Sequence, residues 1–186
     1  MLSNEQEIAA ETREWVKSVV IGEGLCPFAK PVLDSLHIEV SLTENDNLLT
    51  EQLMNLMARM VDTPATELPT ALFVVARALD HFDQYWNWFD ICDRLNSQMG
   101  YEGIIQLASF HPRYVFEGES ESDMSHFTNR SPFPMVHLIR EEDIDQTLNG
   151  VAFPERIPER NRQHMRKLGR QGLIEVMPSL ARLFHP

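Results

Sequence analysis

Residues 109–140 read SFHPRYVFEGESESDMSHFTNRSPFPMVHLIR, and this stretch contains three of the chain's seven histidines. Residues 103–109 are mostly apolar and predict a strand that ends where the stretch begins, and residues 135–139 predict a second strand near its end. The residues between them are largely polar and include prolines at both ends, as in a surface loop. The stretch therefore predicts two strands joined by a long loop, with polar side chains concentrated at the strand ends.

Outside this stretch, strand patterns alternate with helix patterns. Residues 36–42 carry an apolar side chain at every second position, and residues 71–76 (ALFVVA) are apolar throughout, as in a strand covered on both faces. Apolar residues at spacings near 3.6 predict the helices. We expect helices from a cap at Ser3 or Asn4 to Gly22, from Thr43 or Asn45 to before Pro64, from a cap at Asp80 to Gln98, over residues 141–148, and from Pro154 or Pro158 to about Arg170.

The order of these elements predicts the topology. Strand–helix–strand units place consecutive strands parallel, so the first three strands should end at one edge of the sheet, where open α/β sheets build their sites. We expect the fourth strand to be antiparallel and to begin where the third ends. The fold class is α/β, or α+β, in a single domain over residues 1–186. Its mixed, mostly parallel sheet of about four strands is covered by helices, with an N-terminal helix and a C-terminal helical extension.

The charge of the chain limits its partners. It has 28 acidic and 16 basic side chains, a net charge of -12 and a pI near 4.9, which argues against nucleic acid because phosphate binding depends on Lys and Arg. No apolar run approaches the roughly 20 residues that span a bilayer, so we expect no membrane partner. The first residues, MLSNEQE, lack the features of a signal peptide, and two cysteines build no disulfide framework. We therefore expect a cytoplasmic protein.

The polar residues at the predicted strand edge suggest a binding site. His111 follows the third strand, where a histidine can serve as a general acid or base, although it can equally tie down a loop. Asn129, Arg130 and Ser131 offer an amide, a guanidinium fork and a hydroxyl, which suit a carboxylate or phosphate. His137 is a further ligand-binding candidate, but strand alternation favours a half-buried, hydrogen-bonded histidine. We expect a small anionic ligand near His111 and Arg130, and whether the protein is an enzyme stays open.

Other residues give alternative hypotheses. The turn from Cys26 to Ala29 is similar to the active-site turn of thiol oxidoreductases, so thiol chemistry at Cys26 is one alternative, although Ala29 replaces the second cysteine. Arg160 starts a basic helix whose backbone N–H groups can help to bind an anion. That helix can also dock an acidic partner without catalysis, through Arg162, Arg166 and Arg170. The histidines are irregularly spaced, so we expect no metal site, and the sequence leaves the cofactor unknown.

Four blocks of this sequence resemble a known family. They are Leu25-Cys26-Pro27-Phe28-Ala29, Ser109-Phe110-His111-Pro112, Asn129-Arg130-Ser131-Pro132-Phe133-Pro134 with His137-Leu138-Ile139-Arg140, and Glu159-Arg160-Asn161. In this order they are similar to the recurring blocks of a bacterial family catalogued as domain of unknown function family 1415, and the resemblance spans about residues 11–168. The family carries no established activity, so the resemblance implies no catalytic role. It implies that the blocks are family features.

Overall fold

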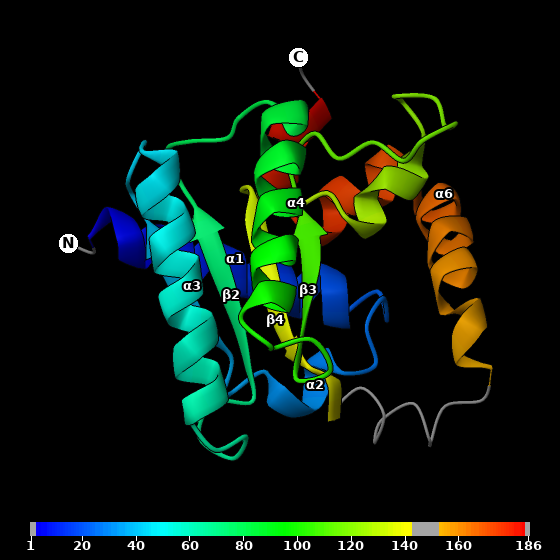
Figure 1. The fold of residues 1–186 in the computed structure, drawn as a ribbon. Helices are drawn as coiled ribbons and strands as arrows, with labels where there is room; N and C mark the ends of the chain where they lie inside the picture. The colour runs from blue at the N-terminus through cyan, green and yellow to red at the C-terminus, as the bar shows by residue number, and fades with distance from the viewer. Residues whose placement is uncertain (1–2, 143–152, 185–186) are drawn as a thin grey trace.

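The computed structural model describes residues 3–142 and 153–184. The strands are β1 (His37–Ser41), β2 (Thr70–Val75), β3 (Ile105–Phe110) and β4 (Met135–Arg140). They form one sheet in the order β1-β2-β4-β3 (Figure 1). β1 and β2 are parallel, whereas β4 is antiparallel to both of its neighbours. The expected mixed α/β sheet and the reversed fourth strand are thus confirmed, and the insertion of β4 leaves only one of the three pairings parallel.

The register of β3 and β4 brings together the two ends of the stretch that joins them. Phe110, the last residue of β3, pairs with Met135, the first residue of β4, and Ile105 pairs with Arg140. The third strand therefore ends where the fourth begins, as predicted. The loop over residues 111–134 leaves and re-enters the sheet at this edge, and it contains the 3-10 helix η2 (Met124–Thr128).

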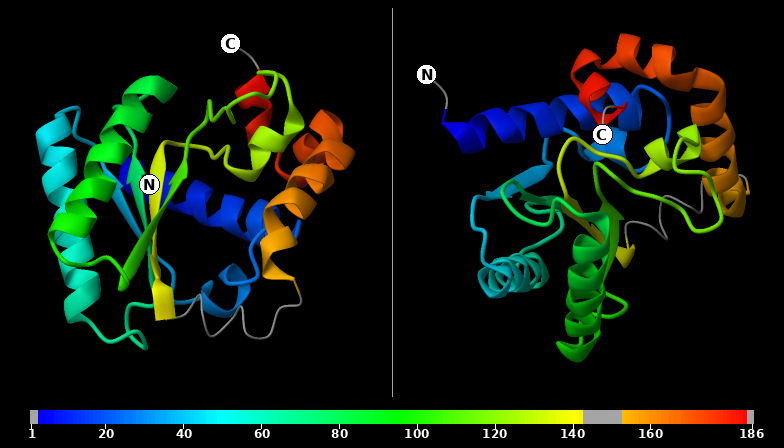
Figure 2. Two further views of the ribbon diagram at one scale, coloured as in Figure 1. Left: turned by 45° about the vertical axis from the view of Figure 1, so that its right-hand side comes forward. Right: turned by 90° about the horizontal axis from the view of Figure 1, so that it is seen from above.

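Helices cover both faces of the sheet (Figures 1 and 2). One face packs against α3 (Asp46–Asp62) and α4 (Phe82–Gln98), and the other packs against α1 (Asn4–Trp15) and its π-helical continuation η1 (Val16–Ile21). α6 (Ile157–Val176) stands to the side of the sheet, where it packs against η2 and η1 (Figure 1). β2 is buried throughout because its side chains enter both layers, as expected for a strand covered on both faces. Within the described ranges, no helix is both long enough and apolar enough to cross a membrane.

The starts of α1 and α3 follow local capping rules, whereas the start of α4 does not. Ser3 and Gln6 form a capping box at the start of α1, and the Asn45 side chain caps α3 by accepting from the Leu48 N–H. The predicted cap at Asp80 is wrong. α4 begins at Phe82, after an extended residue whose side chain makes no capping hydrogen bond.

The C-terminal helical region is longer than its sequence pattern suggested. The short η3 (Pro154–Arg156) precedes α6, which continues past residue 170 and bends at Gly169. The φ and ψ of Gly169, 67° and 177°, lie in a region that is almost restricted to glycine. After this bend, α6 and η4 (Pro178–Phe184) bury Leu173 and Leu180, so the apolar tail docks on the domain as predicted. Residues 143–148 of the helix expected after β4 lie outside the described residues.

Candidate functional site

His111 follows β3 directly, but its imidazole ring packs inside the core of the protein. The side chain is fully buried, and the ring centroids of Phe82 and Tyr85 lie 5.5 and 5.0 Å from its own. Its Nδ1 accepts from the Arg113 N–H (2.9 Å), and its Nε2 donates to the Leu79 carbonyl (2.9 Å). Burial lowers the pKa of His111 to about 4, so the ring is neutral at pH 7. Both ring nitrogens are hydrogen-bonded to backbone groups, so neither is free for the acid–base role considered for this residue.

The residues expected to bind an anion instead brace the loop that follows β3. Arg130 donates to two loop carbonyls (3.0 and 3.1 Å), and its guanidinium lies over an aromatic ring of η2. Asn129 donates to a carbonyl of β3 (3.1 Å), and Ser131 donates to the carbonyl two residues ahead (2.6 Å). The polar atoms that were expected to meet at a ligand beside His111 therefore order the loop.

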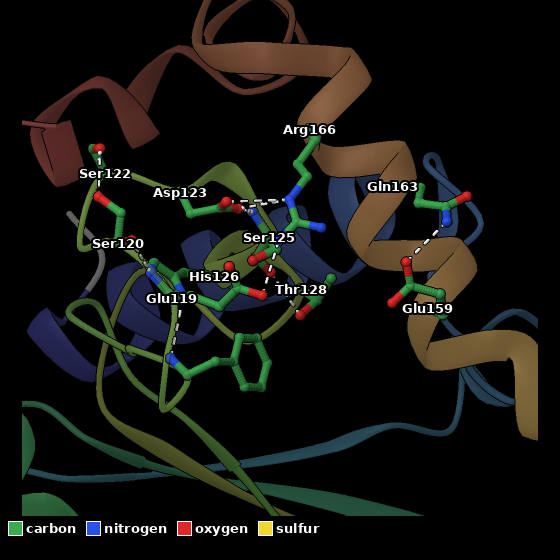
Figure 3. Close-up of polar contacts among 11 residues, drawn as sticks. Glu119, Ser120, Ser122, Asp123, Ser125, His126, Thr128, Glu159, Gln163 and Arg166 are labelled. Atoms are coloured by element: carbon green, nitrogen blue, oxygen red, sulfur yellow. Dashed lines mark hydrogen bonds and ion pairs between the residues drawn. The ribbon is translucent and has the colours of Figure 1, made fainter.

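α6 holds the middle of the same loop (Figure 3). Arg166 donates to both carboxylate oxygens of Asp123 (3.0 and 3.2 Å) and pairs with Glu119 (3.0 Å). Its guanidinium keeps the pKa of Asp123 at about 2. His126 is buried, and both of its ring nitrogens are bonded to loop backbone. Arg166, one of the arginines of the alternative docking surface, is thus engaged within the chain.

The start of α6 positions the turn that carries Cys26. Arg160 donates to the Gly24 carbonyl (3.0 Å), and Asn161 donates to the Leu25 carbonyl (2.6 Å). These bonds connect segments 136 residues apart in the sequence. Arg160, which was a candidate for anion binding, therefore holds the backbone that precedes Cys26.

The thiol of Cys26 is partly buried ahead of the short helix α2 (Ala29–Val32). Burial raises the pKa of the Cys26 thiol, whereas hydrogen bonds from the Phe28 and Ala29 N–H groups lower it by less. The net result is a thiol that is neutral at pH 7. This is the opposite of the stabilised thiolate on which thiol oxidoreductases depend.

Alkylation of Cys26 is therefore expected to be several-fold slower at pH 7 than alkylation of a free cysteine, because little thiolate is present. Iodoacetamide labelling followed by mass spectrometry, over a range of pH, measures this rate. The Cys26→Ser variant is the control, since it leaves only Cys92, whose pKa burial raises to about 12. Labelling of Cys26 that is faster than that of free cysteine would contradict this expectation and restore the hypothesis of thiol chemistry.

Cys26 lies between two cavities, which share Val20, Cys26 and Phe110 in their walls. We call the first the sheet-face cavity, because it lies on the face of β2 and β4 that packs against α1. Its volume is about 280 Å³, and its other lining residues include Trp15, Val16, Leu36, Thr70, Leu72 and His137. We call the second the loop cavity. Its volume is about 250 Å³, and its other lining residues include Leu25, Phe116, Thr128, Asn129, Asn161 and Arg162.

The loop cavity is where the blocks quoted from the sequence meet in space. Cys26 comes from the first block, Phe110 from the second, Asn129 from the third and Asn161 from the fourth. The cavity wall thus joins the N-terminal turn, the end of β3, the loop and the start of α6. The sequence predicted that these blocks matter, but it placed the common site at His111 and Arg130, neither of which lines this cavity.

Arg162 is the cationic residue of the loop cavity. Its guanidinium carbon lies 4.8 Å from the ring centroid of Phe116, in a cation–π arrangement. Among residues 3–142 and 153–184 it makes no hydrogen bond or ion pair, in contrast to Arg166 one turn later, which has two acidic partners. The sequence pattern grouped the two arginines on one basic helix, and nothing in it separates a paired arginine from an unpaired one.

His137 lines the sheet-face cavity rather than the loop cavity. It is half-buried, and its Nε2 lies 2.7 Å from the Thr70 hydroxyl. This confirms the expectation of a half-buried, hydrogen-bonded histidine on β4. Trp15, which also lines this cavity, has an indole N–H that is buried without an acceptor. Neither Trp15 nor Thr70 was a candidate from the sequence, because each fits an ordinary core pattern there.

The comparisons with known proteins agree with the resemblance noted in the sequence. The family model described as Protein of unknown function (DUF1415) matches residues 7–175, a range that contains all four blocks. No curated protein and no solved structure matches the chain. Because the matched range covers most of the 186 residues, the chain belongs to the DUF1415 family.

Proposed function

We propose that the protein binds a small anionic ligand, bearing a carboxylate or phosphate group, in the loop cavity through Arg162. One observation supports this proposal: Arg162 lines the cavity, and its guanidinium has no acidic partner among the described residues. The described lining of the loop cavity contains no carboxylate and no imidazole. In a chain with a net charge of -12, an arginine that has no acidic partner among the described residues is available for an anion.

The geometry around Arg162 suits recognition of a planar or tetrahedral anion. A guanidinium presents its N–H donors as a fixed fork, which binds carboxylate and phosphate in a bidentate manner. The contact with Phe116 restricts the guanidinium to one side of the cavity. Ile157 and Pro158, the first residues of α6, line the same cavity, and the N-terminal end of a helix favours negative charge.

The volume of the loop cavity limits the ligand to a small metabolite. At about 250 Å³ it is slightly smaller than the range of about 300–1,000 Å³ typical of pockets for drug-sized ligands. Cys26 and Cys92 are free thiols, which fits the reducing cytoplasm that we propose as the protein's location. We propose binding and no reaction, since burial keeps the Cys26 thiol protonated and the Thr128 hydroxyl in the described lining donates to the Ser125 carbonyl (2.9 Å).

The test compares Arg162→Gln with Lys167→Gln. A thermal-shift screen of the wild-type protein against phosphorylated metabolites and small carboxylates identifies a ligand, and calorimetry measures its affinity. Arg162→Gln is expected to weaken binding by about tenfold or more, because a hydrogen bond to a charged group contributes roughly 1.5–3 kcal/mol. Lys167→Gln removes an equal charge from an exposed position of the same helix and is expected to change the affinity little.

Two results would count against the proposal. One is a screen in which no anion raises the melting temperature of the wild-type protein. The other is an equal loss of affinity in the two variants, which would indicate a general effect of charge. Binding at Arg162 should also weaken as the salt concentration rises, since ions screen a partly exposed charge.

A further inference from the structure

We propose that the sheet-face cavity is a second binding site, for a neutral aromatic molecule that carries one hydroxyl or N–H group. The site is separate from the loop cavity, and the proposal does not depend on Arg162. Two observations support it: the size and apolar lining of the cavity, and an unoccupied acceptor on His137.

The lining and the volume of the cavity determine the size and the apolar character of the ligand. Most of the cavity wall is aliphatic or aromatic, and residues such as Val16, Leu36 and Leu72 enclose it between β2 and the N-terminal helix. Its volume of about 280 Å³ is roughly twice that of the 150 Å³ engineered cavity that binds benzene. A bicyclic aromatic compound of the size of naphthalene or indole therefore matches the space.

The hydrogen bonds of Thr70 determine which nitrogen of His137 is free. The Thr70 hydroxyl has a single proton, which it donates to the Leu138 carbonyl (2.9 Å). It must therefore accept from His137, so the proton of the neutral imidazole is on Nε2 (2.7 Å). The lone pair of Nδ1 is then an acceptor, and it has no partner in the part of the chain that the structure describes. A ligand that donates one hydrogen bond satisfies it.

The polar contact of the ligand is expected at His137 and not at Trp15. The Trp15 side chain is 2% exposed, and its indole Nε1 is buried out of reach of the cavity space and has no hydrogen-bond partner among the described residues. His137 Nδ1 is therefore the acceptor that one hydroxyl or N–H group of the ligand satisfies. A carboxylate is disfavoured here, because the wall is apolar and burial keeps the imidazole uncharged, with its pKa lowered to about 4.

The experiment uses 2-naphthol, which is neutral at pH 7 and donates a hydrogen bond, and 2-methoxynaphthalene, which has the same rings and no donor. Calorimetry on the full chain should show that 2-naphthol binds about fivefold more tightly, the effect of one neutral hydrogen bond. His137→Phe keeps a ring in the cavity wall and removes the acceptor, while the Thr70 hydroxyl still donates to the Leu138 carbonyl, so the ratio of the two affinities should fall to about one. The ¹⁵N shift of His137 Nδ1 should also change when 2-naphthol binds to the wild-type protein.

Two further variants locate the binding. Ala65 lines the sheet-face cavity from a partly exposed loop, and Ala65→Phe should abolish binding of both compounds by filling the space without disturbing a strand. Arg162→Gln should leave both affinities unchanged, which separates this site from the loop cavity. The proposal is overturned if neither compound binds the wild-type protein, if the two bind equally, or if Ala65→Phe binds them as the wild type does.

Discussion

Acidification from pH 6.5 to pH 4 is expected to reduce the free energy of unfolding by about 3 kcal/mol for His111, with a comparable loss for His137. Burial lowers the pKa of both imidazoles from 6.5 to about 4. Between these values the unfolded chain binds protons that the folded protein does not. Stability therefore decreases as the pH falls through this interval, and it is retained in full above pH 6.5.

Urea unfolding in a series of buffers between pH 7 and pH 4 measures this loss. His137→Gln and His111→Gln each remove one of the two titrations, so each variant should lose about 3 kcal/mol less than the wild type over the same interval. The lowered pKa of Asp123 contributes in a different window, between 3.8 and about 2, and does not interfere. Equal pH dependence in the wild type and both variants would show that the two rings are not buried as neutral groups.

The two histidines also show how far the sequence determines the site. Strand alternation correctly placed His137 on the same face of β4 as Met135 and Ile139, because the period of a strand depends only on backbone geometry. Whether that face is filled or hollow depends on the helix and the turn that pack over it, and a sequence pattern does not specify them. His111 shows the converse. Its position after β3 suggested a reactive group, but its two ring nitrogens are hydrogen-bonded to the Arg113 N–H, which follows it, and to the Leu79 carbonyl, which lies 32 residues earlier.

Arg130 and Arg162 likewise show that the sequence does not reveal which charged side chains have partners in the folded protein. Both are arginines beside aromatic rings, and only the first has carbonyls within reach, from residues 9 and 16 positions earlier in the loop. The sequence predicted the strands, their directions and the common edge, because hydrophobic periodicity and chain connectivity determine these features. It did not predict which guanidinium stays unpaired, because that depends on the tertiary path of a long loop.

Replacing Arg140 with Met is expected to reduce the free energy of unfolding by about 3 kcal/mol, since several charge-assisted hydrogen bonds are lost together. The guanidinium of Arg140, at the end of β4, donates through Nη2 to the Met60 and Thr63 carbonyls (2.6 Å each) and through Nε to the Leu68 carbonyl (3.1 Å). It thereby satisfies carbonyl groups at and beyond the C-terminal end of α3, where a positive charge is also favoured by the helix dipole.

Methionine retains an apolar stem of similar length and leaves no large cavity, so the loss of unfolding free energy measures the missing hydrogen-bond donors. Urea unfolding at pH 7 measures it. The matched control is Arg94→Met, which removes an exposed ion pair with Asp90 on α4 and is expected to cost less than about 0.5 kcal/mol. Equal stability of the two variants would mean that Arg140 does not cap α3. A large loss confined to Arg140→Met would instead identify this side chain as the link that fixes the C-terminal end of α3 to β4, a central strand of the sheet.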